Sequence, residues 1–200
     1  MTEQVITYPS LNRPEYFTQE ELGWRPWLQA PNVDDLSERQ QAGLVDKARA
    51  ASDYFRLLAR DPDILGARTR TDKDIFYNTK EGLPRDDREL AAAATSRVNG
   101  CVFCASVHAR FASHFSDRHQ DIQRLLDQGS SSDLGTRWNA IVAAATALAQ
   151  TPPRLNAGHI AALQHEGLDA LELSDVIHGS AFFNWANRLM LSIGEPEQPA

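Results

Sequence analysis

The sequence has few cysteines and no long apolar run. Only 2 Cys occur among 200 residues, too few for the disulfide framework of a small secreted domain. No apolar stretch approaches the roughly 18 residues of a membrane-spanning helix. Residues 1–10 also lack the basic and apolar regions of a secretory signal. We therefore expect a cytoplasmic protein with no membrane association.

Positive charge is also scarce. Lys and Arg number 20 against 27 Asp and Glu, which gives a net charge of −7. Because no cluster of Lys and Arg is long enough to follow a phosphate backbone, we expect no nucleic-acid partner. The apolar share of 42% and the charged share of 24% are those of an ordinary globular protein. A chain of this length suffices for one domain with a full core.

The alternation of apolar and polar residues that marks a half-buried strand is missing over any useful length, and so is an internal repeat. Apolar residues recur instead at helical spacing. We therefore expect an all-α fold, a single-domain helical bundle. The predicted helices cover about residues 37–60, 62–78, 86–98, 101–115, 119–127, 133–150, 155–166 and 171–192.

Prolines and aromatic residues crowd the first part of the chain and indicate an irregular arm. We assign residues 1–33 to this N-terminal arm, packed on the domain or on a neighbouring subunit, with a short helix near residues 18–22. Residues 34–194 form the helical domain, and residues 195–200 are a tail. Because the arm is aromatic and the last helix is apolar, we expect subunit contacts and a homo-oligomer.

The two cysteines, Cys101 and Cys104, are three positions apart. A bridge between them would close almost no loop and would add little stability, so the pair needs a chemical explanation. At about 100° per residue, Cys101, Cys104 and His108 fall within roughly 60° on one helix face and can address one pocket. If the helix begins near Cys101, Cys104 lies in its first turn, where the helix dipole favours a thiolate.

A carboxylate upstream completes a proton relay. Glu89 is followed on its helix by small residues that allow another helix to approach closely, which could bring the carboxylate to His108. We expect Glu89 to orient and deprotonate His108, and His108 to activate Cys104. Cys104 would then attack the O–O bond of a peroxide, and Cys101 would resolve the sulfenic acid as a disulfide. An external dithiol must reduce that bridge.

These motifs resemble the core of the alkylhydroperoxidase D / carboxymuconolactone decarboxylase superfamily. In its alkylhydroperoxidase members a glutamate lies twelve residues before a C-x-x-C-x-x-x-H motif, as Glu89 lies before Cys101. The sharp motifs span residues 83–115, and segments 24–27 and 183–188 are similar to a longer peroxidase-related branch. The matching residues are Leu83, Pro84, Arg88, Glu89, Leu90, Ser96, Asn99, Gly100, Cys101, Cys104 and His108.

The resemblance implies an all-helical fold, oligomers and reduction of peroxides by the cysteine pair, with glutamate and histidine as the relay. The substrate would be a hydroperoxide, and the reductant a dithiol of the thioredoxin or lipoyl type. One position departs from the pattern. Phe103 stands where the best-known alkylhydroperoxidases have a histidine, so any role of that histidine is absent here.

Other interpretations stay open beside this one. The pair could serve general disulfide exchange, or it could act as a redox or stress sensor whose bridge changes oligomer contacts. A structural zinc site is weaker, because Cys101, Cys104 and His108 leave the tetrahedral shell one ligand short. His114 points to another face of the same helix, and His119 lies beyond a predicted helix break. We expect no metal and no cofactor.

Overall fold

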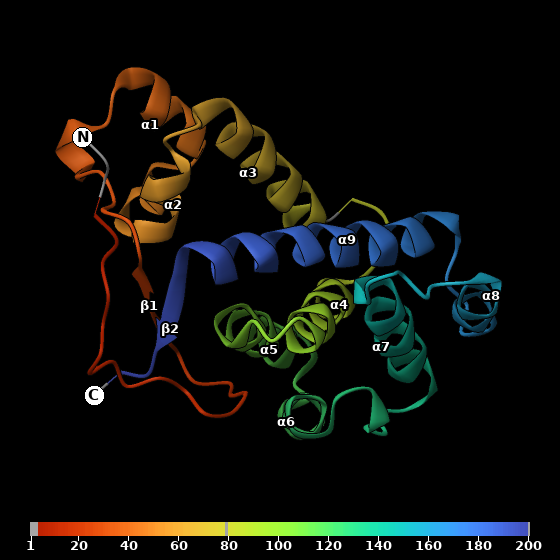
Figure 1. The fold of residues 1–200 in the computed structure, drawn as a ribbon. Helices are drawn as coiled ribbons and strands as arrows, with labels where there is room; N and C mark the ends of the chain where they lie inside the picture. Colours follow the sequence, from red (N-terminus) through yellow and green to blue (C-terminus); the bar gives the residue numbers. More distant parts are fainter. Residues whose placement is uncertain (1–3, 79, 200) are drawn as a thin grey trace.

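The computed structural model describes residues 4–78 and 80–199. The long helix α9 (Ala170–Ile193) lies across the molecule, with α1–α3 on one side of it and α4–α7 on the other (Figure 1). The remaining helices are α1 (Glu38–Leu44), α2 (Asp53–Leu58), α3 (Pro62–Tyr77), α4 (Arg85–Val98), α5 (Val102–Ser116), α6 (His119–Gln128), α7 (Thr136–Ala149) and α8 (Ala157–His165). Short 3-10 helices cover Val33–Asp35, Lys47–Ala51 and Gly129–Ser131.

The all-α prediction is confirmed. Over the described residues the strands amount to a single antiparallel pair, β1 (Gly23–Pro26) with β2 (Gly194–Glu197). The helices predicted from residue 62 onward are confirmed to within a few residues at each end. Within residues 4–78 and 80–199, none of the helices is both long enough and apolar enough to cross a membrane.

Helix α4 is the centre of the core. Residues 91–94 are four consecutive alanines with almost no exposure to solvent, and α4 packs against α5, α7 and α9. Small side chains on every face let these helices approach closely, so apolar surface is buried all around α4. Large residues of the surrounding helices, such as Ile122 and Ile141, fill the space beside it.

The single helix predicted for residues 37–60 is wrong. The chain leaves the helical conformation at Val45, which has a φ of 62°, and Asp46 caps a new turn by accepting a hydrogen bond from the backbone of Ala48. The break comes where α1 meets α3, since a Cβ on Gly43 would lie 2.6 Å from the carbonyl oxygen of Pro62. Tertiary packing here overrides helical periodicity.

The short helix expected near residues 18–22 is also absent, because the arm is held by distant partners. The side chain of Gln19 donates to the carbonyl of His119, and the hydroxyl of Ser113 donates to Gln19. Further along, β1 pairs with β2 from Gly23 opposite Glu197 to Pro26 opposite Gly194. The arm thus contacts helices of its own chain and the last residues before the C-terminus. Its division from the domain at residue 33 stays a prediction.

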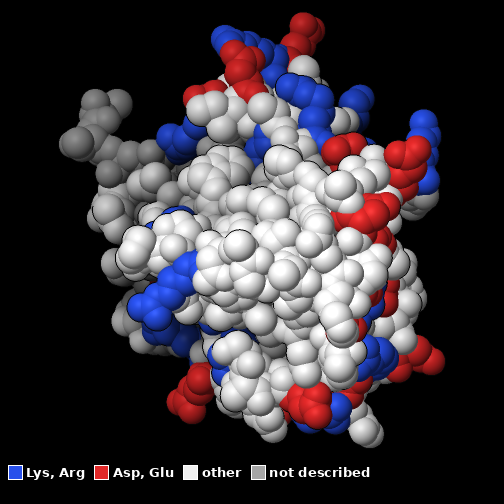
Figure 2. Space-filling model, turned by 90° about the vertical axis from the view of Figure 1, so that its right-hand side faces the viewer, with Lys and Arg blue, Asp and Glu red and all other residues white. Residues whose placement is uncertain are grey.

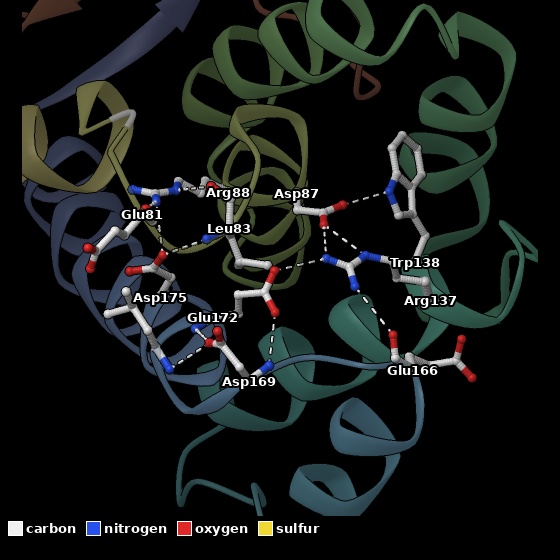
Figure 3. A network of polar contacts seen from close by, with 11 residues as sticks. Glu81, Leu83, Asp87, Arg88, Arg137, Trp138, Glu166, Asp169, Glu172 and Asp175 are labelled. Carbon is white, nitrogen blue, oxygen red and sulfur yellow. Dashed lines mark hydrogen bonds and ion pairs between the residues drawn. The ribbon is translucent and has the colours of Figure 1, made fainter.

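A polar network fixes the start of α4 (Figure 3). Buried Asp87 accepts hydrogen bonds from Arg137, at 3.0 and 2.8 Å, and from the indole of Trp138 at 2.9 Å. Burial raises the pKa of Asp87 above its usual value, while Arg137 and Trp138 oppose the rise. Buried Arg88 lies 3.0 Å from Asp175 of α9. Two charged residues of the first turn therefore tie α4 to α7 and α9.

The turn before α4 depends on a glycine. Gly82 has a φ of +81°, and a Cβ there would lie 2.1 Å from the carboxylate of Asp175. That carboxylate accepts a hydrogen bond of 2.8 Å from the backbone of Leu83. Only glycine offers both the left-handed conformation and the space for this contact.

Removal of the Asp87 carboxylate should destabilise the fold. We expect Asp87→Ala to lower the free energy of unfolding by about 2–4 kcal/mol, because buried donors of Trp138 and Arg137 lose their acceptor. Urea unfolding followed by circular dichroism measures the change. Asp86→Ala, at the neighbouring position with no such partners, is the control. Equal stability of the two variants would contradict this role for Asp87.

Candidate active site

A cavity of about 690 Å³ reaches the predicted site residues. Helices α2, α3, α4, α5 and α9 and the N-terminal arm all contribute to its wall. Glu89, Cys104 and His108 line it, whereas Cys101 is not part of the lining. The aromatic residues of the wall are Trp24, Tyr54, Phe55, Phe76, Tyr77, Phe103, Phe111 and Phe183.

Glu89 lies at the back of the cavity between two cationic partners. Its side chain is only 1% exposed, and its Oε1 accepts hydrogen bonds from Arg85, one turn earlier on α4, at 2.6 Å. Its Oε2 lies 2.5 Å from Nδ1 of His108 on α5. A buried carboxylate without such partners would be very costly, so these contacts fix the position of α5 beside α4. The predicted approach of Glu89 to His108 is thus present in the structure.

The imidazole of His108 is held in one orientation. Its ring stacks on Phe76 at a centroid distance of 5.2 Å and meets Phe183 edge-on at 4.0 Å. Because an ionised carboxylate only accepts, Nδ1 carries the proton that bonds Glu89. Nε2 is then the basic nitrogen and can take a proton from a group in the cavity.

The two cysteines occupy the start of α5. Cys101 is the N-cap residue, and Gly100 before it has a φ of +75°, which turns the chain sharply out of α4. The Sγ atoms of Cys101 and Cys104 lie 2.8 Å apart, and both thiols are free. Cys101 is 1% exposed and Cys104 is 6% exposed. A reagent in the cavity therefore meets Cys104 first.

The two thiols differ sharply in acidity. A hydrogen bond from the Cys104 thiol lowers the pKa of Cys101, burial opposes this, and the Cys104 backbone N–H and Asn187 also lower it. The bond to Cys101 and burial raise the pKa of Cys104 well above its usual value. The first negative charge thus falls on Cys101, not on Cys104 as the sequence predicted, because the Cys101 sulfur accepts from the thiol and the backbone N–H of Cys104.

Asn187 of α9 completes this end of the site. It is fully buried, and its amide donates to the hydroxyl of Ser96 at 3.0 Å. Its oxygen accepts at 3.0 Å from Asn99, the residue that closes α4. The same side chain helps to lower the pKa of both thiols. Helix α9 therefore supports the turn that carries the cysteines.

Sequence reasoning named Glu89, Cys101, Cys104 and His108, and the structure brings these four together. It missed Arg85, although a spacing of four residues before Glu89 on one helix is a recognisable signal. It singled out segment 183–188 but gave Asn187 no role, because no local pattern shows that a residue reaches the site from a distant helix. No group of three His, Cys, Asp or Glu suited to hold a metal ion occurs in residues 4–78 and 80–199.

The family model for the carboxymuconolactone decarboxylase family matches residues 62–147, which include all four predicted site residues. Over these residues the chain is similar to the carboxymuconolactone decarboxylase family. No curated protein sequence gave a significant match.

Solved structures share the fold. A peroxidase-related protein with an alkylhydroperoxidase AhpD core from Ralstonia eutropha JMP134 superposes with a TM-score of 0.70 at 22% identity, over 82% of this chain and 88% of that chain. A peroxidase-related protein from Silicibacter sp. TM1040 gives 0.69 at 20% identity, over 84% and 88%. The debrominase Bmp8 gives 0.61 at 17% identity, over 81% and 83%.

Because the pKa of Cys101 is lowered and that of Cys104 is raised, we expect the two thiols to titrate in two separate steps. With both cysteines reduced, thiolate absorbance near 240 nm should rise by one equivalent below the ordinary thiol pKa of about 8.5 and by a second equivalent only at strongly alkaline pH. Cys104→Ser should leave a single step and remove the high one. Two equivalents of thiolate appearing together near the ordinary pKa would contradict a hydrogen bond that holds one proton between the two sulfurs.

Proposed function

We propose that this protein is a thiol-dependent peroxidase that reduces a hydroperoxide to an alcohol. The observation that carries the proposal is the direct contact of His108 with buried Glu89 at the wall of a cavity that also exposes Cys104. A reactive thiol, a base and an orienting carboxylate are the parts that this reaction needs. The fold shared with peroxidase-related proteins supports the same function.

The reaction begins at Cys104, because it is the cysteine that lines the cavity. The proton shared by the two sulfurs moves to Cys101, and the Cys104 thiolate attacks the terminal oxygen of the hydroperoxide. Nε2 of His108 holds the proton that the thiol pair lost when it became a thiolate. The O–O bond breaks, Cys104 becomes a sulfenic acid, and the leaving alkoxide takes this proton from Nε2. Glu89 stabilises the charged imidazole until it gives up this proton.

Cys101 then closes the cycle. Its sulfur attacks the sulfur of the sulfenic acid, a disulfide forms, and water leaves. The starting separation of 2.8 Å between the sulfurs suits this step. An external dithiol, such as a thioredoxin or a protein-bound lipoyl group, reduces the bridge and supplies the two electrons that the peroxide consumes. We place the cycle in the cytoplasm, where such dithiols keep cysteines reduced.

Replacement of the attacking sulfur tests the proposal. Cys104→Ser should abolish turnover of cumene hydroperoxide with dihydrolipoamide as reductant, while Cys101→Ser should allow at most one turnover. His114→Gln, an exposed change on the same helix, should keep wild-type activity and serves as the control. Unchanged turnover in Cys104→Ser would contradict the proposed attack by Cys104. Disulfide exchange without peroxide reduction in the wild type would favour the general disulfide oxidoreductase instead.

Reductive removal of bromine is a second candidate, favoured by the aromatic wall of the cavity. Bmp8, which shares the fold, is a debrominase and was also solved with 2,3,4-tribromopyrrole. Here the two thiols would become a disulfide, a ring C–H would replace C–Br, and bromide and a proton would leave. Bromide release from 2,3,4-tribromopyrrole in the same assay would support this function, and peroxide turnover without bromide release would reject it.

We also propose that the chain forms a homo-oligomer. The side on which α8 lies presents a broad face with few charged side chains (Figure 2), and α8 itself contains no Lys, Arg, Asp or Glu. A large uncharged face is typical of a subunit contact. Sedimentation should give a mass above that of one chain, and a monomeric mass would contradict the proposal.

A further inference from the structure

One cation of the cavity wall has hydrogen-bonding capacity that the proposed reaction does not use. Arg68 of α3 lines the cavity and is only 8% exposed. Its Nε and Nη1 atoms are buried without a hydrogen-bond partner within the described part of the chain. Burial of unsatisfied donors, and above all of charged ones, is costly, so this side chain needs an explanation.

The neighbours of Arg68 hold its guanidinium in place but accept no hydrogen bond from its Nε and Nη1 atoms. The group lies over the rings of Phe55 and Phe182, at 5.1 and 5.3 Å from their centroids. Asp72 forms an ion pair with Nη1 at 3.6 Å, which is too long for a hydrogen bond, and Asp72 also accepts at 2.6 Å from Arg49. The cation is thus oriented in advance, and its Nε and Nη1 donors are not used by the protein itself.

The other charges of the wall have partners of their own. Glu89 is bonded to Arg85, and Asp53 is bonded to Arg56. Glu21 is exposed at the rim of the cavity, 3.9 Å from Arg110. Among the described lining residues, Arg68 is therefore the cation best suited to receive a new anion.

Arg68 and the reacting sulfur of Cys104 line the same cavity. Tyr54 packs with both cysteines in one buried cluster, and Arg68 approaches the hydroxyl of the same tyrosine. Burial raises the pKa of Tyr54 to about 12, so it stays neutral beside the cation. The positive charge of Arg68 lowers the pKa of Cys104 slightly against the larger effects that raise it. A ligand held at Arg68 can extend along the aromatic wall to Cys104.

We propose that Arg68 binds the carboxylate of an organic hydroperoxide, so that the substrate is a hydroperoxy acid with an apolar carbon skeleton. This inference rests on the proposed peroxidase function. The carboxylate satisfies the free donors of the guanidinium, and the aromatic side chains cover the skeleton. The hydroperoxide group then faces Cys104 and Nε2 of His108.

A matched pair of substrates tests the kinetic consequence. Wild-type protein should reduce the hydroperoxide of linoleic acid with a kcat/KM at least about tenfold above that for its methyl ester, because an ionic hydrogen bond is lost in the ester. Arg68→Gln should remove the preference mainly through KM, and Arg68→Lys should retain part of it. Arg70→Gln, on the exposed side of α3, is the control. Equal rates for acid and ester in the wild type, or an equal fall of both in Arg68→Gln, would overturn the proposal.

Binding without turnover separates this proposal from the peroxidase function. Calorimetry should show that reduced wild-type protein binds decanoate at least about tenfold more tightly than 1-decanol, and that Arg68→Gln does not distinguish them. If the protein shows this binding but no peroxidase activity, the carboxylate site is supported and the proposed peroxidase function is contradicted. Equal affinity of the wild type for both compounds would reject the carboxylate site, whatever the activity.

Discussion

The buried carboxylate of Glu89 is the constraint on which the site depends. A charge with 1% exposure is tolerated only where strong partners replace water. Arg85 supplies one partner from the same helix, and His108 supplies the other from α5. The pairing therefore fixes the distance between two helices, the orientation of an imidazole and the identity of its basic nitrogen at the same time.

The surrounding helices hold this pairing of Glu89 with Arg85 and His108 in place. Four buried alanines on α4 allow α5, α7 and α9 to approach, and the polar network around Asp87 anchors the first turn of α4 near Arg85 and Glu89. At the other end of α4, Gly100 reverses the chain so that Cys101 caps α5. Helix α9 then places Asn187 and Phe183 against this turn and the imidazole.

Much of this arrangement follows from the sequence, because it rests on local patterns. Helical periodicity predicted the helices after residue 62, and the spacing of Glu89, Cys101, Cys104 and His108 predicted the cluster. The failures have tertiary causes. Val45 adopts a positive φ where α1 meets α3, and the arm forms β1 because a strand from the far end of the chain pairs with it. The sequence predicted the thiolate at Cys104, whereas the hydrogen bond between the two thiols lowers the pKa of Cys101 and raises that of Cys104. Arg68 and Tyr54 were not predicted as site residues, because they reach the cavity from other helices.

The central claim is that Glu89, acting through His108, makes the cavity thiol reactive toward peroxide. The most direct measurement is the second-order rate constant for oxidation of the reduced protein by a hydroperoxide, in the wild type and in Glu89→Gln. The amide keeps the shape of the side chain but cannot stabilise a charged imidazole, so the rate constant should fall by about 100-fold at neutral pH while the fold is retained. Equal rate constants in the two proteins would contradict the account.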